Sequence, residues 1–316
     1  MSALTLVEVN DDARWDAGVA ASAQGTVFCR SAYLRSLGTP FRRLAVVCGG
    51  KTLALLPAVE DASGQCLVQP PFTPYQGVLF LHDAGALPRQ RLLDEYRVAE
   101  FVVAELAMRY REIALALSWT FQDLRPFLWH NYHLDDGPRF AVKPRYTALL
   151  KLDGASADSF AAQARACRRQ ELRKAADFTV SDLPDVERFL DLYAETFARQ
   201  QIALAPEQLA LVRRITEPAL AQGYGRLSSC TTPQGVASIN LFLYDQRRAY
   251  YLFAANDPAL RHTGAATRLM FDNIVHAQQR GVAELDFVGV NSPNRGDFKL
   301  SFNPELRLYF EVALAA

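Results

Sequence analysis

The chain has 316 residues, half of them apolar and 22% charged, and this length exceeds what one ordinary hydrophobic core serves, so we expect two globular domains. The composition excludes collagen-like, coiled-coil and intrinsically disordered chains. Lys plus Arg and Asp plus Glu number 34 each, so no overall charge favours nucleic acid or a membrane surface, and a charged ligand has to be recognised by a local group of residues.

The N-terminus and the cysteines predict a soluble, cytoplasmic protein without metal. The first residues lack the basic segment and apolar run of a signal peptide, and no stretch approaches the roughly 18 apolar residues of a membrane span. The five cysteines are scattered and form no C-x-x-C or Cys/His cluster. We therefore expect neither structural disulfides nor a bound metal ion.

The first half of the chain reads as helices, a hairpin, a long helix and a strand. Gly49 and Gly50 separate two β-rich runs, which predicts a hairpin with a tight glycine turn. Pro88 opens a stretch with apolar residues at helical spacing. In chain order, the expected elements are helices over 11–21 and 31–37, strands over 43–48, 52–59 and 78–81, a helix over 88–110 and a strand over 113–117.

The second half repeats this order. Gly281 follows the last periodic residue of one helix, where a C-terminal cap belongs. In chain order, the expected elements are one long basic helix over 155–176, helices over 185–200 and 206–222, strands over 225–230, 236–244 and 248–255, a helix over 264–280, and strands over 284–288 and 306–312. The repeat predicts a duplicated α/β unit with domains over 1–150 and 151–316.

The turn before the helix over 264–280 is a candidate anion site. The first turn of a helix has unpaired N–H donors and partial positive charge, and small residues let a diphosphate approach them. The alternative is an ordinary helix start whose small residues serve packing. The corresponding helix of the first half opens with Pro88, which removes one donor. The residues of the turn are Arg261, His262, Thr263, Gly264, Ala265 and Ala266.

A second candidate site joins Asp286, at the end of a predicted strand, to Phe298 and Lys299 beyond a polar loop. The Lys299 ammonium, between two apolar neighbours, would donate to a developing oxyanion or exchange protons with a lowered pKa. The alternative is a surface lysine whose stem covers apolar groups. Asp286 is either a catalytic base or the cap of the loop that follows it.

Other candidates carry weaker signals. The five histidines share no metal-ligand or triad spacing, and no nucleophile elbow is present. A rigid aromatic loop contains Tyr75, and a second aromatic stretch contains Trp129; either lines a ligand cleft or packs in a core. The basic helix carrying Arg168 either meets phosphates or tRNA or presents an ordinary solvated face.

With these pieces in chain order, the sequence resembles the FemAB-like branch of the GNAT acyltransferase superfamily, whose members have two tandem GNAT-type domains. The resemblance spans nearly the whole chain. It rests on these motifs: Gln24-Gly25-Thr26-Val27-Phe28, Pro74-Tyr75-Gln76-Gly77, Arg125-Pro126-Phe127-Leu128-Trp129, Pro144-Arg145-Tyr146-Thr147, the basic helix from Arg168 to Ala175, Tyr251-Leu252-Phe253-Ala254-Ala255, Gly264-Ala265, Gly281, Asp286-Phe287-Val288-Gly289, and Phe298-Lys299 with Phe302.

The resemblance implies an α/β (α+β) chain of two tandem GNAT-like domains, each with a mixed, mostly antiparallel sheet flanked by helices. It implies transfer of an acyl group from acyl-CoA, acetyl-CoA included, to a small-molecule amine. A charged-tRNA donor, as in the cell-wall FemABX enzymes, is the alternative, and so is a noncatalytic GNAT pair. The tRNA donor is less favoured because only the helix from Arg165 to Lys174 offers an extended basic surface on a chain of zero net charge.

The resemblance also assigns roles to residues. Phe298 and Lys299 match the acyl-transfer pair, with Asp286 a weaker candidate for acid/base work. The turn over 261–266 matches the pyrophosphate loop, with Ala266 in place of its last glycine. The strand carrying Phe253 borders the donor, and Tyr75, Trp129 and Arg168 are assigned to the acceptor side. The usual glycine after the final phenylalanine is replaced by Asn303, which also tolerates positive φ.

Overall fold

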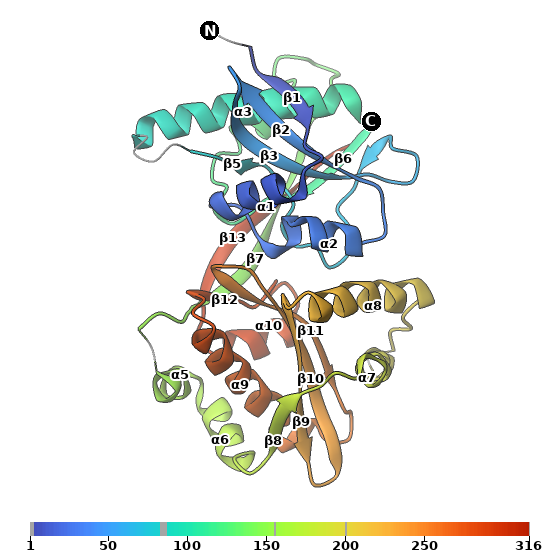
Figure 1. Ribbon diagram of the computed structural model, residues 1–316, viewed down its shortest axis with the longest axis vertical. Coiled ribbons are helices and arrows are strands. Elements are labelled where there is room, and N and C mark those ends of the chain that lie inside the picture. The colour runs from blue at the N-terminus through green and yellow to red at the C-terminus, as the bar shows by residue number, and fades with distance from the viewer. Residues whose placement is uncertain (1–2, 83–86, 155, 200, 316) are drawn as a thin grey trace. The chain divides into compact units, whose positions relative to one another are not determined.

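The computed structural model describes residues 3–82, 87–154, 156–199 and 201–315. The chain forms two compact units, Met1–Arg145 with Leu308–Ala316 and Tyr146–Arg307 (Figure 1). Among the described residues, none of the helices combines the length and apolar character that a membrane crossing requires. Mixed sheets flanked by helices make up both units, which confirms the predicted fold class.

The first unit is built around two small sheets. The β1-β2-β3-β5 sheet is antiparallel, and β6 pairs in parallel with β4 and antiparallel with the last strand of the chain. Apolar side chains of α3, such as Val102 and Leu106, are buried against strand residues in the unit's main core. The elements are β1 (Thr5–Glu8), α1 (Asp12–Ala21), α2 (Ser31–Ser36), β2 (Phe41–Cys48), β3 (Lys51–Val59), β4 (Cys66–Leu67), β5 (Leu79–Phe80), α3 (Pro88–Arg109), β6 (Glu112–Ala116) and α4 (Arg125–Leu128).

The second unit has one sheet, in the order β7-β12-β11-β10-β9-β8, in which only β11 and β12 are parallel neighbours. Figure 1 shows α9 on one side of this sheet and α7 with α8 on the other. The elements are β7 (Ala141–Lys151), α5 (Ala157–Gln163), α6 (Ala166–Lys174), β8 (Thr179–Asp182), α7 (Val186–Ala198), α8 (Pro206–Ala221), β9 (Gly225–Thr232), β10 (Gly235–Tyr244), β11 (Arg248–Asn256), α9 (Ala265–Gln279), β12 (Glu284–Asp286), α10 (Pro293–Leu300) and β13 (Glu305–Leu314).

The domain boundary differs from the expected one at the C-terminus. The division lies at Arg145 and Tyr146, and residues 308–316 belong to the first unit instead of the second. The reason is pairing: Glu311 to Leu314 lie antiparallel to β6, and Val312 and Leu314 are buried in the first unit's core. Sequence periodicity identifies such a strand but not its partner, since pairing with either sheet buries the same alternate residues.

The long helix expected after the boundary is two helices, α5 and α6. The break falls at Ala164 and Arg165, whose backbone is extended rather than helical. The Arg165 N–H donates to the Ser301 carbonyl at 2.9 Å, and the Arg169 guanidinium donates to the carbonyls of Ala162 and Ala164. Tertiary hydrogen bonds therefore stabilise a break at residues that are otherwise good helix formers.

Candidate active site

Strands β11 and β12 run side by side for only three residue pairs. The last pair is Tyr250 with Asp286, after which β12 ends while β11 continues to Asn256. The chain turns away at Val288 and Gly289, whose φ angles are +50° and +72°. The second edge of β11 is therefore free of strand pairing beyond Tyr250 within the described part of the chain.

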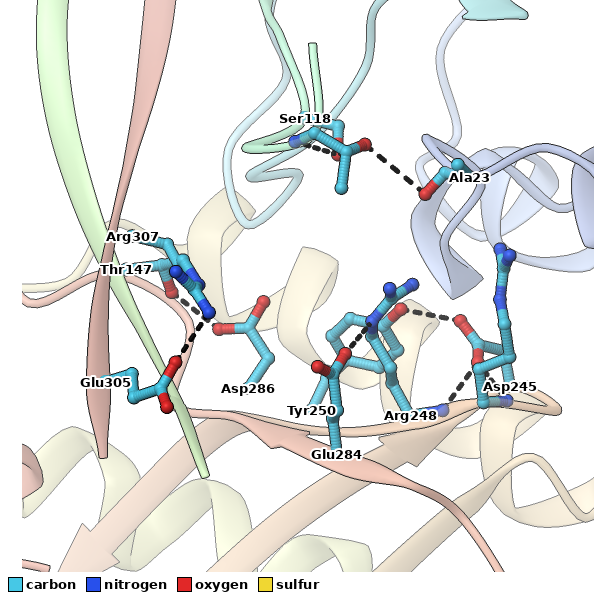
Figure 2. Close-up of polar contacts among 12 residues, drawn as sticks. Ala23, Ser118, Thr147, Asp245, Arg248, Tyr250, Glu284, Asp286, Glu305 and Arg307 are labelled. Atoms are coloured by element: carbon cyan, nitrogen blue, oxygen red, sulfur yellow. Dashed lines mark hydrogen bonds and ion pairs between the residues drawn. The ribbon is translucent and has the colours of Figure 1, made fainter. Parts of the chain in front are cut away.

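Two polar side-chain contacts, largely shielded from solvent, lie just before β11 and β12 separate. The Arg248 guanidinium contacts the Glu284 carboxylate at 2.8 Å, and the Tyr250 hydroxyl donates to Asp245 at 2.5 Å (Figure 2). Burial, with Asp245 nearby, raises the pKa of Tyr250 well above its ordinary value, so this hydroxyl stays protonated at neutral pH. None of these four residues carried a recognisable motif, because their meeting depends on strand register.

Lys299 of α10 lies at the point of separation. Its ammonium donates to the carbonyls of Val288 at 2.9 Å and Gly289 at 3.0 Å, and Nζ lies 5.5 Å from the centroid of the Tyr251 ring. An ammonium has three N–H donors, and the described residues offer no acceptor to the third one. The half-buried Lys299 thus has one N–H for a ligand oxygen.

The surroundings of Lys299 change its proton affinity. Burial lowers the pKa of Lys299 to about 8; the Asp286 carboxylate opposes this shift and Arg295 adds to it. At pH 7 the side chain is therefore mostly an ammonium, and above pH 8 it is mostly a neutral amine. The predicted oxyanion donor is present in the neutral range, and a proton acceptor is available at only slightly higher pH.

Asp286 caps the turn that follows it. Its Oδ1 atom accepts a hydrogen bond from the Thr147 hydroxyl at 2.5 Å (Figure 2) and another from the Val288 N–H at 2.8 Å. The residue is completely buried. Of the two interpretations left open by the sequence, the contact to the N–H two residues ahead favours the cap. The sequence identified Thr147 only as part of a motif and did not predict its contact with Asp286. The two residues are 139 positions apart in sequence.

Phe298 belongs to the same site through packing. Its ring lies 5.1 Å from the Phe302 ring, and the Arg168 guanidinium carbon lies 5.1 Å from the Phe298 ring centroid. Phe302 is buried, and Asn303 after it has a φ of +62°. The turn that usually needs glycine is therefore formed with asparagine, as expected.

The predicted pyrophosphate turn has the expected backbone. Gly264 has a φ of +92° and α9 starts at the next residue. The Thr263 hydroxyl donates to the Leu260 carbonyl at 2.6 Å and accepts from the Ala265 N–H at 3.3 Å. Arg261 is exposed, Ala265 is buried and Ala266 is half-buried. The strand, turn and helix are thus in place.

Helix α6 covers this turn, which the sequence did not predict. An added Cβ on Gly264 would lie 2.8 Å from the Glu171 carbonyl oxygen, so the two backbones touch. The Thr267 hydroxyl donates to the Glu171 carboxylate at 2.5 Å, and the Lys174 ammonium donates to the His262 carbonyl at 3.0 Å. The Glu171 carboxylate therefore lies beside Thr267 in the first turn of α9, and α6 covers the turn that was expected to bind an anion.

Arg168 lies beside the start of α9, and the Phe253 ring lies in the core of the second unit. Arg168 donates to the Thr267 hydroxyl at 2.9 Å and pairs with Glu171 at 2.7 Å, so it lies at the start of α9 in the predicted donor region. The Phe253 ring is buried against Tyr193 and Phe189 of α7, at centroid distances of 5.6 and 6.3 Å. Its ring serves the core of the second unit.

The two aromatic acceptor candidates lie in the first unit and differ in exposure. Tyr75 is buried, with ring contacts to Trp119 at 4.7 Å and Tyr309 at 5.4 Å. Trp129 is 51% exposed and lies 5.5 Å from the Arg125 guanidinium carbon. Only the Trp129 ring is open to a ligand in this conformation. The described residues contain no group of three or more His, Cys, Asp or Glu side chains placed to hold a metal ion.

Comparisons with known proteins agree with this architecture. Residues 159–300 match the family model described as an acetyltransferase (GNAT) domain. No curated protein sequence matches the chain. Among solved structures, FemX is similar with a TM-score of 0.66 at 14% identity, covering 97% of this chain and 96% of FemX.

Two further structures have the same fold. A tandem GNAT protein from the clavulanic acid biosynthesis pathway superposes with a TM-score of 0.55 at 13% identity, covering 99% of each chain. L-PGS from Bacillus licheniformis superposes with a TM-score of 0.53 at 14% identity, covering 98% of this chain and 93% of L-PGS. Residues 159–300 therefore match a GNAT-type acetyltransferase domain, and the whole chain has the fold of FemX and of the tandem GNAT protein.

Proposed function

We propose that the protein is an N-acyltransferase that moves an acyl group from acyl-CoA to a small-molecule amine. One observation carries the proposal. The Lys299 ammonium is held by the Val288 and Gly289 carbonyls where β11 and β12 part, and its third N–H has no acceptor among the described residues. A fixed cation with a free donor suits a developing negative charge better than it suits a structural ion pair.

In the proposed reaction the amine nitrogen attacks the acyl carbonyl carbon, and the carbonyl oxygen becomes an oxyanion that accepts the free N–H of Lys299. When the tetrahedral intermediate collapses, the carbon–sulfur bond breaks and the electron pair leaves with sulfur. The proton lost by the amine goes to the departing thiolate. Lys299 only donates a hydrogen bond, so it returns to its starting state. One such donor lowers the activation barrier by about 3–4 kcal/mol.

The choice of donor rests on the turn over 261–266. Its backbone resembles a pyrophosphate loop, and the balanced charge of the chain disfavours a tRNA. The covering helix α6 is a specific observation for the alternative, an aminoacyl ester on tRNA that needs no diphosphate at this turn. We propose that the amine acceptor contacts the exposed Trp129 ring. We propose a supporting role for Tyr75, which is buried inside the first unit.

The test is a transfer assay with three donors. Acetyl-CoA, a medium-chain acyl-CoA and an aminoacyl-tRNA are each incubated with the protein and a panel of primary amines, and amide products are detected by mass spectrometry. Amide formation with one or both thioesters supports the proposal. If amide forms from aminoacyl-tRNA alone, the donor is aminoacyl-tRNA instead of acyl-CoA, and the proposed acyl transfer to an amine still holds. A ligand that binds without amide formation from any donor overturns the proposal in favour of a noncatalytic GNAT pair.

A further inference from the structure

The turn that holds Lys299 has a second anchor, on β7. Thr147 is completely buried, and its hydroxyl both donates to Asp286 Oδ1 at 2.5 Å and accepts from the Gly289 N–H at 3.2 Å. Its chain neighbours contribute as well. The Ala148 carbonyl accepts from the Phe287 N–H, and the Tyr146 carbonyl accepts from the Val290 N–H, each at 3.0 Å. Three consecutive residues thus bind the turn from end to end.

The turn needs this support because its backbone is unfavourable. Val288 is β-branched and has a φ of +50°, a conformation that costs about 1–3 kcal/mol and persists only when neighbours enforce it. Gly289 follows with a φ of +72°. Two left-handed residues in succession direct both carbonyls to the Lys299 ammonium, while the N–H groups on Val288 and Gly289 go to Asp286 and Thr147.

We propose that Thr147 is a positioning residue, which holds the turn over 286–289 and through it fixes the place of the Lys299 ammonium. Thr147 touches neither Lys299 nor any reacting atom in this arrangement; it acts through the turn. Its effect on turnover rests on the proposed function, whereas its effect on Lys299 itself does not.

Removing the hydroxyl has a defined physical consequence. Thr147→Val keeps the side-chain volume but leaves the Gly289 N–H without an acceptor and removes one donor from the buried Asp286 carboxylate. The strained Val288 conformation then has less support, and the turn relaxes. Lys299 loses the paired carbonyls and gains contact with water. Because burial is the main cause of its lowered pKa, that pKa moves upward.

The experiment measures Lys299 directly. The folded protein is labelled briefly with acetic anhydride from pH 6 to pH 11, and modification of the peptide that contains Lys299 is followed by mass spectrometry. We compare wild type, Thr147→Val, Thr147→Ala and Thr147→Ser. Thr216→Val is the matched control, since Thr216 is also completely buried in the second unit and its hydroxyl donates only within α8. Thermal unfolding checks that each variant is folded.

We expect wild-type Lys299 to titrate near pH 8. The valine and alanine variants should titrate at least one pH unit higher, while Thr147→Ser and Thr216→Val stay near wild type. Where amide formation is detectable, kcat of Thr147→Val falls about tenfold. The decrease of its kcat at high pH also moves to higher pH, in the same direction as the titration of Lys299. Unchanged Lys299 titration in whichever of the valine and alanine variants is folded overturns the proposal. A shifted titration without amide formation by wild type overturns the proposed function and leaves the positioning role of Thr147 intact.

Discussion

Two regions of the second unit were expected to meet the acyl donor, and they are built in opposite ways. At the start of α9 the chain supplies its own anion, because Glu171 bonds to Thr267 and α6 packs against Gly264. At the end of β12 the chain supplies a cation with one N–H left over, on Lys299. The region proposed for acyl transfer already holds its lysine in place, whereas the turn proposed to anchor a diphosphate is covered by α6.

The contacts of α6 with α9 and the turn before it are mostly polar. None of the α6 residues is buried, and the helix is held on α9 and the turn before it by side-chain hydrogen bonds of Arg168, Glu171 and Lys174, with Leu172 only partly buried against the core. Single polar contacts of this kind contribute little, about 1 kcal/mol each. Displacing α6 therefore costs far less than opening the apolar core beneath α9.

The largest effect is expected at Gly264. An aspartate there meets the Glu171 backbone at 2.8 Å and has to adopt a φ of +92°, so we expect the free energy of unfolding to fall by about 2–4 kcal/mol. Gly281→Asp is the control, since that glycine has a φ of +74° and open space around it. Urea unfolding compares the two. Equal losses of stability would mean that α6 does not pack on Gly264 in solution.

The next effect concerns the covering carboxylate. Glu171→Gln removes the negative charge at the start of α9, so we expect CoA to bind about tenfold more tightly, equivalent to about 1.4 kcal/mol. Glu217→Gln, on the exposed face of α8, should leave affinity unchanged. Calorimetric titration measures both. Weaker CoA binding in Glu171→Gln would contradict the account of α6 as a competing cover.

The pH dependence tests the other region. Because burial lowers the pKa of Lys299 to about 8, the ammonium proposed to donate to the oxyanion is lost as pH rises through this value. When the step that involves Lys299 limits the rate, kcat should be constant from pH 6.5 to 7.5. Above pH 8.5 it should fall about tenfold per pH unit. A rate that keeps rising to pH 10 would instead assign Lys299 the role of a base.

The smallest effect is expected at Val288. Glycine adopts a φ of +50° without strain, so Val288→Gly should raise the free energy of unfolding by up to about 1 kcal/mol after the entropy cost of glycine is subtracted. Chemical unfolding at pH 7 measures the change. A loss of more than 1 kcal/mol would show that the valine side chain contributes more through packing than its backbone costs.

Much of the fold was predictable from local signals. Gly49 and Gly50 marked the first hairpin, Pro88 the start of α3, and Gly281 the end of α9. Lys299 was identified because it follows Phe298 in a recognisable pair. Thr147 and Glu171 were missed as site residues because their roles depend on partners 139 and 96 positions away. The break between α5 and α6 was missed because tertiary hydrogen bonds, and no helix-breaking residue, produce it.

The proposed role of Lys299 in acyl transfer is tested most directly by Lys299→Met. The control is Lys143→Met, at an exposed lysine of the first unit. Donor affinity by calorimetry and turnover by amide formation are measured on both variants. We expect kcat of Lys299→Met to fall about 10²–10³-fold while the dissociation constant of the donor stays within about twofold, since the proposed role of Lys299 is to stabilise charge that exists only in the transition state. Turnover equal to that of Lys143→Met would contradict it.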